Sequence, residues 1–560
     1  MREKYEEALV EAALRRHRRT VDPAPEGKLI EGVIVDGSDV ILPGDFPLSK
    51  TIPWTFANYF HTKTRPYILA QELLFQVGEP YRRERIEESG RNLRRFFILS
   101  VARLVATRGS APDRVVVLVV AKDQWSLRFN TEFVLDQERF DALSFSFSEN
   151  NLAGRNKTFE IDYALDPGRH LVGAGYVDPR VWSSRSSLRA YVGLYLDRRR
   201  SRPEGGYVQL AFGQPLYSLG TEWAWEARFL WLEDLSRLFR GGTLNVLDLG
   251  GGESAPDVYE RRRFGGSFAV TRSFGRRHKV NVSAGLRWDA NRYRLPQATA
   301  ELLSPAAESR FAQVRLPRSE EAGSVYVSLS AFRAEFARLK DIETFALSED
   351  FRVGPGLTVE ARYATPILGL PSHFFELLAS YSHFHQIGDD LLSYSFRLAA
   401  RAQDGVWPGG GWLVNQEVFA QVRNVSPRFG PFRVHLQAQL RLRGHDLDNL
   451  RLTLGSDSGL RGFQPRAFDG NNLYLVNLEL RTVALNLWTI HVGGVLFYDG
   501  GDAPKTLWQA GWHHDAGLGV RLLIPQFNRS VLRLDLAFPI EAPRSGGYVP
   551  RFSAEFGQAF

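Results

Sequence analysis

Most of the chain, from residue 126 to residue 560, alternates apolar and polar residues in short segments. In the first segment Leu127 and Phe129 fall on one face of an extended strand, and Arg128 and Asn130 fall on the other. Successive side chains of a β-strand point to opposite faces. Segments of roughly ten alternating residues are typical of membrane-spanning strands with one lipid face and one lumenal face. The pattern predicts an all-β transmembrane antiparallel β-barrel.

The strands of this barrel can be counted from the alternation and from the turn residues between segments. The segments lie at 126–135, 140–149, 157–166, 170–179, 187–197, 206–216, 222–232, 262–274, 278–290, 323–336, 357–364, 374–384, 391–403, 413–424, 432–443, 472–482, 490–500, 514–523, 531–540 and 551–560. The count is therefore about twenty, an even number, as single-chain bacterial barrels prefer.

The lengths of the connections support this topology. If the first strand runs upward from the N-terminal region, the long connections 235–257, 291–322 and 444–471 all fall on the extracellular side. Short turns such as 274–277 and 524–530 fall on the other side. A β-propeller would show a repeat of about 40–50 residues, which the sequence lacks. A soluble β-sandwich would have to bury the apolar face of every strand, and the sequence has too many such strands for one core and offers no second core.

The N-terminal quarter has a different pattern. Residues 1–26 predict a helix over 2–19 and a linker at Val21–Pro25. This helix is either frayed and solvated, or it docks on a partner or plugs a pore. Residues 27–125 predict a compact α+β domain with a strand at Lys28–Val35, helical patterning within Trp54–Leu74, a helix at Arg82–Arg95 and a hairpin of Phe96–Val105 with Asp113–Val120. The expected domains are thus 1–26, 27–125 and 126–560.

Composition agrees with a barrel and excludes several other classes. The 50 glycines, 12 tryptophans, 38 phenylalanines and 19 tyrosines suit strands, turns and aromatic girdles. The longest apolar run, Val115–Ala121, is far shorter than the ~20 residues of a membrane helix. The chain has no cysteine, which excludes disulfides, thiol catalysis and cysteine-ligated metals.

The net charge of +7 comes from arginines scattered along the chain, so nucleic acid is not an expected partner. A basic barrel suits anionic lipid or lipopolysaccharide instead. The charged start of the chain has no apolar core of a signal peptide. Because Met1 is the only methionine, we interpret it as a start placed on a mature sequence, and export stays compatible with the sequence.

The most informative stretch is Leu452–Arg481, a glycine-rich loop followed by an alternating strand. Strand parity places Glu479 on the lumenal face of that strand and Asp499 on the lumenal face of the next one. A guanidinium can bridge two carboxylates by charge-assisted hydrogen bonds. The pattern therefore predicts a contact of Arg461, at the centre of the loop, with both acids. The alternative is a solvated loop arginine and two unrelated lumenal acids.

The neighbours of this arginine fit the same prediction. Gly462 is expected to permit a backbone turn that other residues resist, and Phe463 is expected to pack against the barrel wall.

Three motifs, taken together, resemble the BamA/TamA/two-partner-secretion transporter superfamily of outer-membrane insertases and secretion barrels. Leu460-Arg461-Gly462-Phe463 matches the (V/L)RG(F/Y) tip of the family's inward-folded loop. Phe497-Tyr498-Asp499-Gly500-Gly501 matches its F-x-D-x-G strand motif, which includes Phe497 and Gly501. The last strand, with Phe552, Phe556, Gly557 and a terminal Phe560, is similar to the C-terminal signal of outer-membrane proteins.

The resemblance has several implications for fold and function. It implies a barrel of sixteen strands, fewer than the segment count, and a lumenal loop at 444–471. It implies that residues 27–125 form a periplasmic POTRA-like domain, although a plain structural α+β domain would show the same pattern. It also implies a weak seam between the first and last strands, and a role in assembling or secreting client polypeptides across the bacterial outer membrane. A periplasmic protein or lipoprotein is a further candidate partner at the POTRA-like domain.

Two other functions are compatible with a barrel of this kind. A passive outer-membrane pore whose periplasmic domain recruits a partner complex is the main alternative, and an outer-membrane hydrolase is a third. Residues 455–459 do not meet the register of a G-x-S-x-G nucleophile elbow. His513 and His514, beside Asp515, point to opposite faces of a strand, and the glycines at 250–252 lack a phosphate-loop context. We therefore expect no enzyme, no cofactor and no metal.

Overall fold

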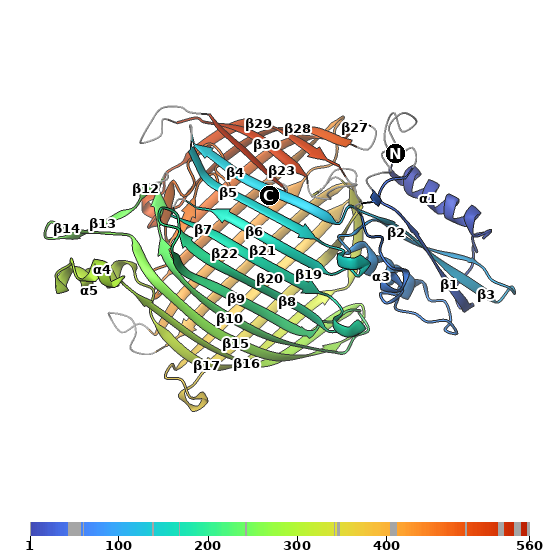
Figure 1. The fold of residues 1–560 in the computed structure, drawn as a ribbon, viewed down its shortest axis with the longest axis horizontal. Helices are drawn as coiled ribbons and strands as arrows, with labels where there is room; N and C mark the ends of the chain where they lie inside the picture. Colours follow the sequence, from blue (N-terminus) through green and yellow to red (C-terminus); the bar gives the residue numbers. More distant parts are fainter. Residues whose placement is uncertain are drawn as a thin grey trace.

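The computed structural model consists of an N-terminal α/β domain followed by a β-barrel (Figure 1). None of the helices in the described part of the chain is long and apolar enough to cross a membrane. The structure describes residues 2–42, 58–59, 61–136, 139–166, 168–240, 243–340, 342–343, 348–403, 412–487, 490–524, 531–541 and 550–556.

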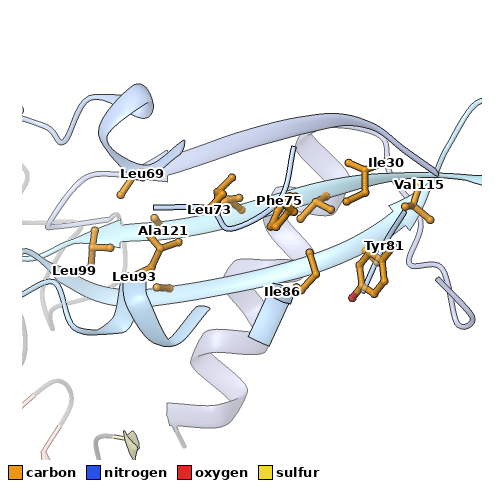
Figure 2. Close-up of a cluster of buried hydrophobic side chains, with 14 of the residues drawn as sticks. Ile30, Leu69, Leu73, Phe75, Tyr81, Ile86, Leu93, Leu99, Val115 and Ala121 are labelled. Atoms are coloured by element: carbon orange, nitrogen blue, oxygen red, sulfur yellow. The ribbon is translucent and has the colours of Figure 1, made fainter. Parts of the chain in front are cut away.

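The N-terminal domain is built on a three-stranded sheet in the order β1-β3-β2. The central strand β3 (Arg114–Asp123) pairs in parallel with β1 (Leu29–Ser38) and antiparallel with β2 (Leu99–Arg108). Helices α2 (Pro66–Ala70) and α3 (Arg83–Arg94) contribute Leu69, Ile86 and Leu93 to the core on one face of the sheet (Figure 2). Because helices cover both faces, β3 is apolar at nearly every position, as buried parallel strands are.

The helix that covers the second face is α1 (Arg2–Arg16). Its Ala13 packs on Leu118 and Val120 of β3, and Lys122 donates a 2.7 Å hydrogen bond to the hydroxyl of Tyr5. The helix therefore neither frays into solvent nor enters the barrel, and it ends three residues earlier than predicted. Within Trp54–Leu74 the described α-helix is only the short α2, and residues 54–57 and 60 lie outside the described part.

The barrel wall contains twenty antiparallel strands within the described residues. They are β4 (Leu127–Asp136), β5 (Arg139–Glu149), β6 (Thr158–Leu165), β7 (Arg169–Asp178), β8 (Ser187–Asp197), β9 (Pro203–Gln214), β10 (Trp223–Arg237), β15 (Val258–Phe274), β16 (His278–Arg294), β17 (Glu320–Arg333), β19 (Ser348–Ala364), β20 (Phe374–Ile387), β21 (Asp390–Ala402), β22 (Leu413–Val425), β23 (Phe432–Gly444), β26 (Leu473–Thr482), β28 (Ile490–Asp502), β29 (His513–Leu523), β30 (Leu532–Pro539) and β31 (Arg551–Phe556). Each predicted segment corresponds to one of these strands, so the segment count is confirmed and the sixteen implied by resemblance is wrong for this chain.

The outer face of the wall is apolar. On β17, for example, Val325, Val327 and Leu329 are exposed at 42%, 53% and 42%, as lipid-facing side chains of an isolated barrel must be. The lumenal face of the same wall is polar and charged. Single large apolar residues on a protein surface are ordinary, but a continuous apolar band needs a nonaqueous environment.

The wall closes where the last strand meets the first. Only Ser553 with Val134 and Ala554 with Phe133 are paired between β31 and β4 in the described part of the chain. Two adjacent strands elsewhere in the wall, β16 and β17, pair along the whole stretch of β16 from His278 to Asn291.

The two ends of the barrel differ (Figure 1). The N-terminal domain sits at one end. At the opposite end project the hairpin of β13 (Val246–Gly250) with β14 (Glu253–Pro256) and the helices α4 (Gln297–Ala300) and α5 (Pro305–Arg315). The predicted long connections 235–257 and 291–322 thus lie away from the N-terminal domain. One long connection breaks the predicted rule: β18 (Glu335–Lys340) pairs with the start of β19 and extends the wall toward the N-terminal domain.

Candidate functional site

The connection between β23 and β26 folds into the lumen as a hairpin. Its arms are β24 (Leu452–Leu454) and β25 (Phe468–Gly470), which pair antiparallel, and residues 455–467 form the tip. We call residues 452–470 the lumenal hairpin. Leu460 and Phe463 of the tip are buried against the wall residues Leu473 and Leu475. The apolar residues of the tip thus pack against inward-facing leucines of β26, whose alternate positions face lipid.

Arg461 is the centre of the contact between this hairpin and the wall. Its Nε and Nη2 donate to the two carboxylate oxygens of Asp499 at 2.7 and 2.8 Å. Its Nη1 donates to Glu479 at 2.6 Å and to Asp535 at 3.4 Å. The guanidinium also lies over the ring of Phe497, 3.6 Å from the centroid. Arginine satisfies this site because its planar fork donates in several directions at once and stacks on aromatic faces.

The acids that hold Arg461 are themselves held by further residues of the wall. Glu479 accepts from Arg481 at 2.6 Å, and Arg521 donates to Asp535 at 2.5 Å. Asn477 donates both to Asp499, at 2.7 Å, and to the carbonyl of Gly459 in the hairpin, at 2.8 Å.

Burial makes this network strong only while it is complete. Arg461 is 5% exposed, and Glu479 and Asp499 are 0% exposed. Removing water from charges costs several kcal/mol per ion, and only well-placed partners offset that cost. Loss of one partner therefore leaves an uncompensated buried charge, which favours release of the hairpin from the wall.

Gly462 is needed for a reason that differs from the prediction. Its backbone φ is not in the left-handed region. A Cβ at this position would instead lie 2.5 Å from the Cβ of Asp515 and 3.1 Å from the backbone nitrogen of Pro539. The glycine therefore permits close approach of the hairpin tip to β29 and β30, and it is not required for a special turn.

This contact gives a testable prediction. In Gly462→Ala the methyl group meets strand backbone and a buried side chain, so seating the tip is expected to cost about 1–3 kcal/mol, as overpacking does. We expect the hairpin to become sensitive to trypsin at Arg461 and Arg466 in the detergent-solubilised protein. Gly494→Ala is the matched control, because a Cβ there meets only Thr482 at an ordinary 3.8 Å. Equal protection of both variants would contradict the assigned role of Gly462.

The other residues of the predicted strand motif lie in the same place. Phe497 faces the lumen beneath Arg461 and is 5% exposed. A Cβ on Gly501 would lie 2.3 Å from the carbonyl oxygen of Tyr474, so this glycine permits β28 to lie close to β26. The structure thus brings together Leu460, Arg461, Gly462, Phe463, Glu479, Phe497, Asp499 and Gly501.

The predicted C-terminal signal lies elsewhere. Phe552 is on β31 at the seam and is 39% exposed. Only the backbone of Phe556 is described, and Gly557 and Phe560 lie outside the described residues. These residues stay a prediction.

Four residues that complete the network were not among the predicted site residues. Asp535 and Arg521 face the same lumenal cluster from β30 and β29, Asn477 ties the hairpin backbone to Asp499, and Arg481 donates to Glu479. Strand parity carried the signal for all four. Arg521 shares its face with Gly517 and Gly519, small residues that leave room for the guanidinium.

The two histidines that precede Asp515 lie on opposite faces of β29. His513 stacks on Phe468 of the hairpin at 3.9 Å, whereas His514 points to the outer face and contacts the hydroxyl of Tyr498 at 3.0 Å. Among the described residues there is no group of three metal-ligating side chains.

The class of protein follows from these features. A closed antiparallel barrel with an apolar outer face and a charged lumen is an outer-membrane β-barrel. Here a hairpin from one of its connections is bound inside the lumen.

Comparison with known proteins identifies the family. A model described as the Omp85 superfamily domain matches residues 151–560. The chain belongs to the Omp85 superfamily and is an outer-membrane insertase or secretion transporter, of the kind that handles client polypeptides.

Solved structures with similar folds include three barrels from other bacteria. BamA from Haemophilus ducreyi lacking POTRA domains 1–3 is 11% identical with a TM-score of 0.38, over 94% of this chain and 84% of that chain. CdiB from Acinetobacter baumannii is 13% identical with a TM-score of 0.45, over 95% of this chain and 74% of that chain. CdiB from Escherichia coli is 12% identical with a TM-score of 0.48, over 96% of this chain and 80% of that chain. No curated protein matches the chain significantly.

Proposed function

We propose that this protein assembles or secretes client polypeptides through a barrel whose lumenal hairpin is a removable lock. The observation that carries the proposal is the burial of Arg461 among Glu479, Asp499 and Asp535. A hairpin that served only to fill the lumen could be packed with apolar residues at lower desolvation cost. A charged lock with defined geometry suits two states, one with the hairpin bound and one with it released.

The N-terminal domain is proposed to be a periplasmic POTRA-like domain that receives clients or a periplasmic or lipoprotein partner. Support comes from the position of β2 at an edge of the sheet, where an extended peptide can add as a further strand. Val21 bridges to Thr107 and Asp22 donates to the carbonyl of Ala106, so the end of this edge is occupied.

The test replaces Arg461 by alanine and measures client handling. The chain is co-expressed with secreted or barrel-type proteins encoded beside its gene, and surface delivery is compared with the unmodified protein. We expect delivery to fall roughly tenfold, because a hairpin that cannot bind the wall cannot alternate between the bound and the released state. A loss of about 1.4 kcal/mol in the free energy of hairpin binding is enough for a tenfold change. Arg451→Ala is the matched control, since Arg451 directly precedes the lumenal hairpin and pairs with Asp469 of the hairpin, not with the wall acids, at 2.9 Å.

The alternative function is a passive pore whose N-terminal domain recruits a partner complex. Under that alternative Arg461→Ala would raise ion conductance and leave client delivery unchanged. Normal delivery by a folded Arg461→Ala barrel, judged by its heat-modifiable migration in gels, would therefore contradict the lock.

A further inference from the structure

The hairpin of β20 and β21 carries two histidines on one face of the wall. His383 and His385 lie two positions apart in β20, and residues two apart in a strand point to the same side of the sheet. That side is the outer one, because Phe375 and Leu377, at the same parity, are 45% and 43% exposed. Ionisable side chains are rare at lipid-facing positions, so a pair of them marks a candidate binding site.

Two tyrosines lie beside these histidines. Tyr381 occupies the preceding outward position of β20, and Tyr394 of β21 pairs directly with His383 across the hairpin. Tyr394 faces outward as well, because Phe396, at the same parity, is 47% exposed. All four side chains are half-buried. We call His383, His385, Tyr381 and Tyr394 the outer His–Tyr cluster.

One nitrogen of each imidazole faces the same oxygen atom. Nε2 of His385 lies 3.3 Å from the hydroxyl oxygen of Tyr394, and Nδ1 of His383 lies 3.4 Å from that oxygen. The two rings are stacked, with centroids 3.7 Å apart and planes inclined by 14°. A hydroxyl carries a single hydrogen and can donate it to only one of the two nitrogens. A cation at this point would accept the lone pairs of both nitrogens at once.

Other outward histidines have a simpler arrangement. Nε2 of His373 lies 3.0 Å from the hydroxyl of Tyr363, and Nδ1 of His514 lies 3.0 Å from the hydroxyl of Tyr498. One imidazole beside one phenol is what an aromatic girdle at a membrane surface produces. The outer His–Tyr cluster differs because a second imidazole faces the same oxygen, and only a pair of imidazoles can chelate an ion.

The outer His–Tyr cluster lies near the end of the barrel that carries the N-terminal domain. Phe384, between the two histidines, pairs with Gly354 of β19. Shortly before Gly354 in the chain, Asp350 pairs with Arg94 of α3 at 2.8 Å. The turn at 388–389 follows soon after the second histidine. The cluster is therefore at the rim of the wall, where an ion can reach it from water without crossing the bilayer.

The donor atoms of the cluster select the kind of ion. Imidazole nitrogen suits copper, nickel and zinc, whereas Mg²⁺ and Ca²⁺ prefer carboxylate and carbonyl oxygens, which the cluster does not offer. Two nitrogens and a phenol oxygen fit the tetragonal geometry of Cu²⁺. Cu²⁺ also binds most strongly among the divalent first-row ions at a site of this type.

We propose that the outer His–Tyr cluster is a Cu²⁺ site. Nδ1 of His383, Nε2 of His385 and the hydroxyl oxygen of Tyr394 are the protein ligands, and water fills the remaining position. On binding, the phenol of Tyr394 loses its proton to water and the copper stays Cu²⁺, so no oxidant or reductant takes part. Tyr381, whose hydroxyl lies 3.0 Å from Nδ1 of His383, gives up that contact and donates to the phenolate oxygen instead.

A bound ion would tie β20 to β21 on the outer face of the wall. This proposal departs from the sequence-based expectation that the chain holds no metal. It does not depend on the proposed function, because Arg461 and its acids lie on the lumenal face and the cluster lies on the outer one.

The test titrates the full chain with Cu²⁺ in detergent, after purification without a polyhistidine tag and removal of metal with a chelator. We expect one tightly bound ion per chain, coupling to two nitrogens in the electron paramagnetic resonance spectrum, and a phenolate-to-copper band in the visible spectrum. His383→Gln and His385→Gln each remove a ligand. Each is expected to weaken the tight site by at least about tenfold, because even outer-shell partners of a metal contribute that much.

Two further variants complete the test. Tyr394→Phe is expected to keep the coupling to two nitrogens and to lose the visible band. His373→Gln is the matched control, since it removes an outward imidazole that has a tyrosine partner but no second imidazole, and it should change neither signal. Each variant is checked for folding by its heat-modifiable migration in gels, and Tyr394→Phe removes only one oxygen atom from the barrel.

Three results would overturn the copper site. The unmodified protein could bind no Cu²⁺ tightly, which would make the cluster part of the aromatic girdle alone. The tight site could keep its affinity in both histidine variants, which would place it elsewhere in the chain. The visible band could persist in Tyr394→Phe, which would remove Tyr394 from the ligands. Client delivery by Arg461→Ala tests the lumenal lock separately, so failure of one proposal leaves the other standing.

Discussion

Replacing Glu479 by glutamine is expected to lower the free energy of unfolding of the barrel by about 3–5 kcal/mol, the cost of breaking a fully buried ion pair. Glu479 is the common partner of three guanidiniums: Arg461 at 2.6 Å, Arg481 at 2.6 Å and Arg521 at 3.5 Å. Glutamine keeps the shape of the side chain and one acceptor oxygen but removes the negative charge. The three guanidinium groups then repel one another in a site with little water, and fewer negative charges offset this repulsion.

The measurement is urea unfolding of the detergent-solubilised protein, followed by tryptophan fluorescence. Glu226→Gln is the matched control. Glu226 is another lumenal glutamate with arginine partners, Arg189 at 3.3 Å and Arg228 at 2.5 Å, but the three side chains are 31%, 54% and 64% exposed. Exposed pairs contribute about 0–1 kcal/mol, so this variant is expected to unfold near the unmodified protein. Equal losses in the two variants would show that lumenal charge in general, and not the hub position of Glu479, sets stability.

The contact of Arg461 with its two acids was open to prediction because it depends on strand parity alone. In a strand the side-chain period is two, so knowing that Leu478 faces lipid fixes Glu479 as lumenal. The same rule applied to the next strand fixes Asp499. A glycine-flanked arginine in the intervening loop then has few other buried partners of opposite charge.

Residues that join the site through space were harder to predict. Asp535 lies 74 positions after Arg461 in the sequence and reaches it only because the barrel curves β30 toward the hairpin. The reason for Gly462 is likewise spatial: the limit is its distance to Asp515, which no local pattern encodes. The prediction for Gly462 therefore named a backbone turn, whereas this glycine allows the hairpin tip to lie close to Asp515.

The strand number shows a different limit. Counting alternation favoured about twenty strands, the resemblance implied sixteen, and the wall follows the alternation. Each segment must present one face to lipid whatever the family, so periodicity reports directly on the wall. The pairing of β18 with the start of β19 was not predicted, because β18 has only six residues, too few for a clear period.

Locking the seam between the last and first strands is expected to abolish insertion of barrel-type clients. Ala554 and Phe133 are directly paired across this seam, and paired strand positions suit the Cα separation of a disulfide. In the variant Phe133→Cys/Ala554→Cys an oxidised bond would hold β31 to β4. A client strand that pairs with an opened edge would then have no edge to pair with. Because the chain has no cysteine of its own, the engineered bond is the only one that can form.

The assay reconstitutes the oxidised and reduced variant in lipid vesicles and follows folding of an added outer-membrane barrel by its heat-modifiable migration. Oxidised protein is expected to insert at the rate of empty vesicles, and reductant is expected to restore the rate of the unmodified protein. Leu286→Cys/Val325→Cys, across the fully paired β16 and β17, is the control and should insert normally in either state. Insertion by the oxidised seam variant would rule out client entry between β31 and β4. It would then leave passage through the lumen, past Arg461, as the route that clients take.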